Sequence, residues 1–228
     1  MAGGLKEALI LGSKKAIQLL SQDGGYLNDD LVRIPIPEKL QFAEKALRAT
    51  GQSQMVDEFI STMNHAAEEA VPQAVDIFSD SITNMTLEDA RGILTGPEDS
   101  ATQYFKRSST AQLMSAMLPI VKAATAKTGV TESYKRYIAL AEPYIQSGGR
   151  QASGLIDSFG GLGGLGDTAK QYADKSAGFD AESMDIDNYV AQKALDGLFF
   201  KLAEEERLIR TDPIARSTDL LKKVFGSN

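Results

Sequence analysis

The chain has 228 residues, of which 43% are hydrophobic and 24% are charged, a composition typical of a folded globular protein. It contains no cysteine and one histidine, which excludes disulfides, thiolate metal sites and any multi-histidine metal site within one chain. The net charge of −7 argues against nucleic acid as a partner.

Hydrophobic residues recur at helical spacing along most of the chain, which predicts an all-α protein. The first helices are expected over 5–21 and 38–50, and the one extended stretch, Leu31 to Pro37, lies between them. The two prolines of this stretch keep the residues before them out of the helical region, which predicts a rigid connector or an edge strand. A helical pattern then runs from Ser53 to Asn84, where Pro72 kinks the helix or starts a second one.

Capping residues and proline breaks divide the second half of the chain into further helices. Thr86 is expected to cap a short helix that ends at Gly96-Pro97, because an acid follows the threonine three residues later. The remaining helices are predicted over 98–107, 109–127 with Pro119 in its interior, 132–146 capped by Thr131, 187–210 capped by Asp185, and 215–225.

The segment 148–166 is rich in glycine and is predicted to be a flexible loop within a single all-α domain that spans 1–228. Its apolar residues could insert into a membrane surface or cover an apolar pocket, but packing onto the helical core is the simpler interpretation. They are Leu155, Ile156, Phe159, Leu162 and Leu165. The sequence has no run of eighteen apolar residues, so no transmembrane helix is expected.

Common catalytic and cofactor motifs are missing from the sequence. The glycines at 160–166 are not followed by Gly-Lys-Ser/Thr, and there is no Gly-x-Ser-x-Gly. The oxygen-rich stretch from Asp23 to Asp30 lacks the ligand order of an EF-hand, so a capped turn is expected there instead of a calcium site. We therefore expect no cofactor and a protein that is not an enzyme.

A metal site at the histidine is the alternative that would make the protein an enzyme. On a helix, His65 faces Glu68 and Glu69 at three and four residues' distance, and the acids at 204–206 could face them from another helix. Because bundle di-metal sites use two histidines, a surface histidine paired with a glutamate is the favoured interpretation, and His65 and Glu69 are weak metal candidates.

The segment 200–218 is densely charged and allows two interpretations. Glutamate–arginine pairs at four-residue spacing, such as Glu206 with Arg210, are typical of a solvated helix face. Alternatively, Arg210 and Arg216 could bind an anionic group with their planar guanidinium groups.

Several ordered blocks, spread from about Leu5 to Phe225, resemble the bacterial family called domain of unknown function 4197. They include Ile34-Pro35-Ile36-Pro37-Glu38, Met63-Asn64-His65-Ala66-Ala67-Glu68, Asp99-Ser100-Ala101-Thr102-Gln103-Tyr104-Phe105, Lys193-Ala194-Leu195-Asp196-Gly197-Leu198-Phe199 and Ala203-Glu204-Glu205-Glu206. The resemblance implies an all-α protein of Gram-negative bacteria that is usually made with an export or lipoprotein signal, and it implies no established activity. His65 stands where the family pattern has arginine, so a histidine metal site would not be a family property.

The resemblance also indicates polar residues within apolar helical blocks, which would need buried partners and could form one internal network. They are Asn64, Glu68, Thr102, Tyr104, Glu205, Arg210 and Arg216. The network could fix helix register, or it could line a pocket for a small amphipathic or anionic ligand.

These observations favour a non-enzymatic helical binding or scaffold protein of the periplasm or envelope, with a cytoplasmic location as the alternative. Its partner would be a small amphipathic ligand or a protein. The other hypotheses are a carboxylate-rich metal-dependent enzyme and a structural homo-oligomer.

Overall fold

The computed structural model describes residues 2–128, 135–137, 139 and 185–211, and within them every regular element is a helix. The helices are α1 (Ala2–Leu20), α2 (Gln41–Ala49), α3 (Ser53–Ala70), α4 (Ala74–Thr83), α5 (Leu87–Thr95), α6 (Ser100–Thr128) and α10 (Ile186–Thr211). Two 3-10 turns, η1 (Glu38–Leu40) and η2 (Val71–Gln73), precede α2 and α4. The all-α prediction is therefore confirmed.

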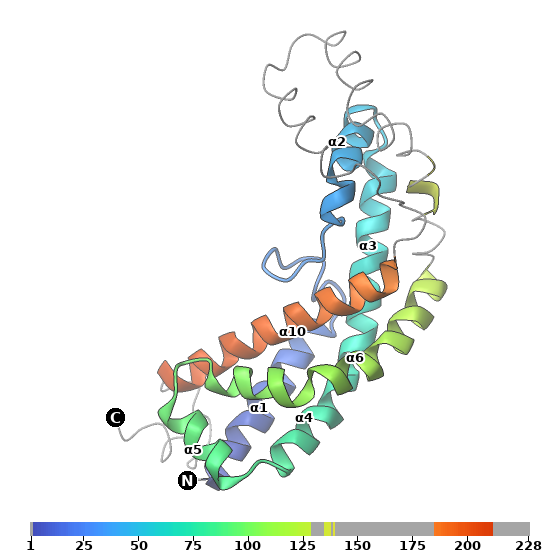
Figure 1. Cartoon of the computed structure of the whole chain (residues 1–228). Coiled ribbons are helices and arrows are strands. Elements are labelled where there is room, and N and C mark those ends of the chain that lie inside the picture. Colours follow the sequence, from blue (N-terminus) through green and yellow to red (C-terminus); the bar gives the residue numbers. More distant parts are fainter. Residues whose placement is uncertain (1, 129–134, 138, 140–184, 212–228) are drawn as a thin grey trace.

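The long helix α6 packs against α10, α3, α4 and α5, and α10 also packs against α1 and α3 (Figure 1). The helices α1, α4, α5 and the first part of α6 gather at one end of the molecule, and α2 lies at the other end beside the start of α3. The predicted buried face of the helix over 187–210 is confirmed, since its six apolar residues are buried. They are Val190, Ala194, Leu195, Leu198, Leu202 and Ile209.

Several predicted helix boundaries agree with the structure for the physical reasons that suggested them. Thr86 and Asp89 form a reciprocal capping box at the start of α5, and the Asp185 carboxylate accepts the Asn188 backbone N–H at the start of α10. At Pro72 the chain passes through the 3-10 turn η2 from α3 into α4, so the proline starts a second helix.

The prediction of two helices over 98–107 and 109–127 is wrong, because residues 100–128 form the single helix α6. At the predicted boundary, Arg107 and Ser108 lie exposed on the surface of this helix, while the next residue, Ser109, is buried. Pro119 lies inside the helix without ending it, and α6 bends along its length (Figure 1).

The stretch from Leu31 to Pro37 is a connector, and no strand occurs among the residues that the structure describes. The predicted helix over 132–146 is described only at 135–137 and 139. The glycine-rich loop at 148–166, the helix over 215–225 and Arg216 lie outside the described residues.

Candidate functional site

The turn that follows α1 depends on two successive glycines. Gly24 has a φ of +79°, a left-handed conformation that glycine adopts without strain. At Gly25 a Cβ atom would lie 2.5 Å from the carbonyl oxygens of both Leu19 and Leu20, so no larger residue fits without moving the backbone. These glycines fold the chain tightly back from α1 and fix the position of the preceding residue, Asp23.

Glu68 of α3 holds the same turn in place from the other side. Its Oε1 accepts hydrogen bonds from the backbone N–H groups of Tyr26 at 3.0 Å and Leu27 at 3.3 Å, and its side chain is only 6% exposed. The Tyr26 hydroxyl donates to the Ala194 carbonyl oxygen of α10 at 2.7 Å. Burial, with a further contribution from the Glu68 charge, raises the pKa of Tyr26, which keeps this hydroxyl protonated. The turn is thus bonded to both α3 and α10.

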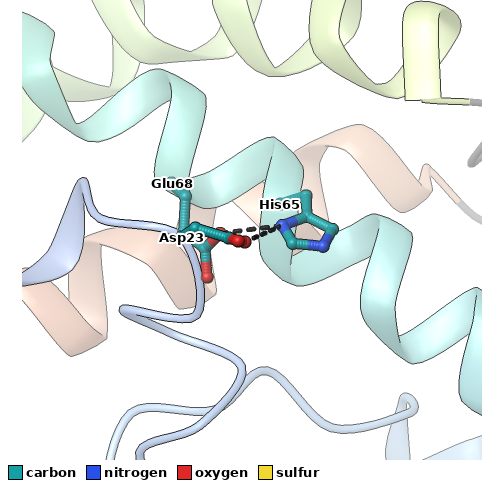
Figure 2. Close-up of side chains that lie close together, drawn as sticks. All are labelled: Asp23, His65 and Glu68. Atoms are coloured by element: carbon teal, nitrogen blue, oxygen red, sulfur yellow. Dashed lines mark hydrogen bonds and ion pairs between the residues drawn. The ribbon is translucent and has the colours of Figure 1, made fainter.

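The second carboxylate oxygen of Glu68 faces His65, one helical turn earlier on α3. The Glu68 Oε2 atom lies 2.8 Å from His65 Nδ1, and Asp23 Oδ1 lies 3.7 Å from the same nitrogen. Figure 2 shows both carboxylates directed at this edge of the imidazole ring. The three residues therefore converge at the surface, where the His65 side chain is 38% exposed.

Asn64, the neighbour of His65, bonds the connector at 31–37 to α3. Its Oδ1 accepts the Ile34 backbone N–H at 2.8 Å, and its Nδ2 donates to the carbonyl oxygens of Ile34 at 3.0 Å and Ile60 at 2.8 Å. All of these atoms are buried, so the amide satisfies backbone groups that water cannot reach.

A second polar group lies where α5, α6 and α10 meet. Glu206 of α10 is 8% exposed and accepts the backbone N–H groups of Ala101 and Thr102, each at 2.9 Å, at the start of α6. The Thr102 hydroxyl donates to the same carboxylate. An anion at this position also interacts favourably with the dipole of α6.

Arg210 completes this second group by pairing with Glu206 at 2.8 Å. The same guanidinium nitrogen donates to the Ile93 carbonyl oxygen near the end of α5, also at 2.8 Å. The predicted pair of Glu206 and Arg210 is present, but it is largely buried and joins three helices. Arg210 therefore bonds to groups of the protein itself, which favours a role in joining helices over the binding of an anionic group.

Those predicted polar residues that the structure describes do not form one continuous network. Asn64 bonds the connector at 31–37, Glu68 bonds the turn after α1, and Thr102 and Arg210 belong to the Glu206 group. Tyr104 donates to the Ser81 carbonyl oxygen, Glu205 pairs with Lys15 at 2.9 Å, and Glu69 pairs with Lys127 at 3.4 Å on the surface. The acids at 204–206 pair with Lys201, Lys15 and Arg210, so they do not join the His65 group.

Two residues that matter in these groups were not among the predicted site residues. Asp23 comes from a turn 42 positions before His65, and no local spacing links the two residues. Glu206 had a detectable signal, because it lies four residues after Leu202 and eight after Leu198 on the apolar face of its helix.

Two small cavities lie beside Glu206, between α1, α6 and α10. Each has a volume of about 20 Å³, which is room for about one water molecule. Gly12 and Ser13 of α1 line one of them, and Ile93 lines the other. These cavities are too small to hold an organic ligand.

The fold and its two polar groups define an all-α protein in which buried carboxylates join separate segments of the chain. None of the described helices combines the length and the apolar character that crossing a membrane requires. The chain belongs to the family described as protein of unknown function (DUF4197), whose model matches residues 1–226. No curated protein and no solved structure matches the chain.

Proposed function

We propose that this chain is a non-enzymatic helical scaffold or binding protein of the bacterial envelope that acts through a protein partner. The observation that carries the proposal is that the buried polar side chains bond separate segments of the chain to one another. Glu68, Asn64 and Glu206 each accept hydrogen bonds from backbone N–H groups of a distant segment. Such side chains hold a fold rigid.

The hydrogen-bond partners of these groups favour a structural role over a catalytic one. A general acid or base needs a free proton or lone pair directed at its substrate. Glu206 instead accepts from two backbone N–H groups, the Thr102 hydroxyl and Arg210. The Tyr137 hydroxyl donates to the Leu40 carbonyl oxygen in the same structural manner.

The choice of a protein partner over a small amphipathic or anionic ligand rests on apolar side chains that the described surface exposes. The two cavities beside Glu206 hold about one water each. By contrast, large apolar side chains reach the solvent, with Leu31 65% and Leu87 79% exposed. The envelope location rests on the family resemblance, whose members usually carry an export or lipoprotein signal.

Native mass spectrometry of the freshly purified full chain, beside a denatured sample, tests the proposal. A native-only species with the added mass of another polypeptide supports it, and a multiple of the chain mass supports a homo-oligomer. An added mass of a few hundred daltons would instead support a small ligand.

Photo-crosslinking in bacteria tests the same proposal at named surface positions. A photoreactive residue at Leu31 or Leu87 should give a discrete adduct, whereas one at the exposed polar position Gln112 on α6 should not. A bare chain in the native spectrum together with no adduct from any of these positions would overturn the proposal.

A further inference from the structure

We propose that Asp23, His65 and Glu68 bind one divalent transition-metal ion of the Zn²⁺ type. Each residue offers one ligand atom, and the three atoms lie within 4.8 Å of one another. This inference is independent of the proposed scaffold role, because it concerns a surface group that no partner contact requires.

The distances between the ligand atoms suit a small ion with short bonds. Zn²⁺ binds nitrogen and oxygen at roughly 2.0–2.2 Å, so two ligand atoms of a tetrahedral site are separated by about 3.3 Å. The distances from His65 Nδ1 are 2.8 Å to Glu68 Oε2 and 3.7 Å to Asp23 Oδ1, which bracket that value. To reach that separation, His65 Nδ1 and Glu68 Oε2 must move apart by about 0.5 Å and Asp23 Oδ1 must approach by about 0.4 Å, and the side chains of His65 and Asp23, 38% and 95% exposed, have room for these shifts.

The donor set selects a transition metal over calcium or magnesium. One imidazole nitrogen with two carboxylate oxygens is a combination that zinc sites use, and it leaves a fourth position for water. Calcium takes six to eight oxygen ligands, which this group does not supply. With neutral His65, the two carboxylates also balance the charge of a divalent ion.

Hydrogen bonds in the surrounding structure position Glu68 and the turn that carries Asp23 before any ion arrives. Glu68 Oε1 is fixed by the backbone N–H groups of Tyr26 and Leu27, so its Oε2 is directed at the ring of His65. Tyr26 and Leu27 belong to the same turn as Asp23. The Glu68 carboxylate therefore supplies one ligand atom, Oε2, and through Oε1 it positions the turn that carries Asp23. Support of this kind from outside the ligand set strengthens metal binding.

Calorimetric titration of Zn²⁺ into the full, tag-free chain is the test. We expect saturable binding of one ion per chain. Because the chain has a single histidine, its ring protons give one set of NMR signals, and Zn²⁺ should shift that set in proportion to occupancy. Saturable binding that leaves the histidine signals unmoved would contradict the assignment.

Three variants make the test specific. Asp23→Asn and His65→Gln should each weaken Zn²⁺ binding by at least about tenfold. Losing a residue that only hydrogen-bonds to a metal ligand already lowers metal affinity by about 10–100-fold, and these two residues are ligands themselves. Glu69→Gln is the matched control, because Glu69 adjoins Glu68 in sequence but pairs with Lys127. The Zn²⁺ affinity of this variant should equal that of the wild type.

Asp23→Asn keeps the test valid if other variants fold poorly, since Asp23 is almost fully exposed. No saturable binding to the folded wild-type chain, or equal affinity in wild type, Asp23→Asn and His65→Gln, would overturn the proposal. Either result leaves the scaffold proposal untouched, because that one is read from partner masses and cross-linked adducts.

Discussion

Glu206 and Glu68 use the same device at two places in the molecule. Each is a nearly buried glutamate on a long helix that accepts two successive backbone N–H groups from a distant segment, at 101–102 and at 26–27 respectively. The difference lies in the other partner. Glu206 pairs with Arg210, which is 14% exposed, whereas Glu68 pairs with His65, which is 38% exposed and lies beside Asp23.

This difference separates a closed group from an open one. Arginine remains charged at every physiological pH and its fork is committed to Glu206 and Ile93, so the α5–α6–α10 junction has a fixed hydrogen-bond pattern. Histidine has a lone pair available when neutral, and its position at the surface lets an ion reach it. A buried glutamate that accepts two backbone N–H groups can therefore belong to a purely structural junction in one place and to a binding site in another.

Glu206→Gln should cause a larger loss of stability than any other single substitution in these two groups. It removes the counter-charge of the largely buried Arg210 and weakens the cap of α6, so the free energy of unfolding should fall by about 3–5 kcal/mol. Urea denaturation followed by circular dichroism measures this. Glu204→Gln, two positions away in a more exposed pair with Lys201, should change it by less than about 1 kcal/mol. Equal losses would show that the junction is not closed in the way described.

Gly25→Ala should have the next largest effect and tests the support of the open group. The new Cβ would lie 2.5 Å from two backbone carbonyl oxygens, and such overpacking costs about 1–3 kcal/mol. Gly51→Ala is the matched control: Gly51 has a φ of +84° but has open space around it, so only the cost of a left-handed alanine remains, about 1 kcal/mol. If both variants lose the same stability in urea denaturation, the turn at Gly25 is not tightly held.

The helical pattern of the sequence was enough to predict most of the fold. Apolar spacing located the buried face of α10, and Thr86, Asp185 and Pro72 marked helix boundaries through local chemistry that needs no tertiary contact. The prediction was wrong at α6, where two helices were expected and the structure has one. Ser109, beside the predicted boundary, is buried, and this burial comes from tertiary packing that the local sequence does not encode.

The candidate site was only half predictable because its two halves depend on different distances along the chain. His65 and Glu68 are three residues apart on one helix, and their pairing follows from helical geometry. Asp23 reaches them through the glycine turn and the Glu68–Tyr26 hydrogen bond, which connects positions 42 residues apart. No sequence spacing encodes that contact, because it is set by the packing of α1 and α3.

Glu68→Gln should destabilise the protein less than Glu206→Gln does. The glutamine oxygen can still accept from Tyr26 and Leu27, and the solvent near His65 compensates for the lost charge, so we expect a loss of about 1–2 kcal/mol. Glu69→Gln, which breaks only the exposed pair with Lys127, should stay within about 0.5 kcal/mol of wild type in the same denaturation assay. A loss at Glu68 that matches the loss at Glu206 would remove the distinction between open and closed groups.

The smallest effect should come from the ion pair that joins the loop after α1 to α10. Lys201 Nζ lies 2.6 Å from Asp29 Oδ2, and its hydrogen bond is the main reason that the pKa of Asp29 is below its ordinary value. Partial burial acts to lower the pKa of Lys201, but the hydrogen bonds that its ammonium group donates to Asp29 and Glu204 outweigh burial, so this pKa is raised. Lys201→Met should therefore lower the free energy of unfolding at neutral pH by less than about 1 kcal/mol.

The pH dependence of this difference identifies its cause. Because the pKa of Asp29 is lowered on folding, its stabilisation is present above the unfolded value of about 3.9 and disappears as the pH falls through the folded value. Because the pKa of Lys201 is raised, its stabilisation is present below about 10.4 and disappears as the pH rises through the folded value. The difference between wild type and Lys201→Met, measured by urea denaturation across pH, should thus be greatest between these limits, and Asp29→Asn should reproduce its acidic limb. A difference that does not vary with pH would mean that Lys201 stabilises the loop through its apolar stem and not through its charge.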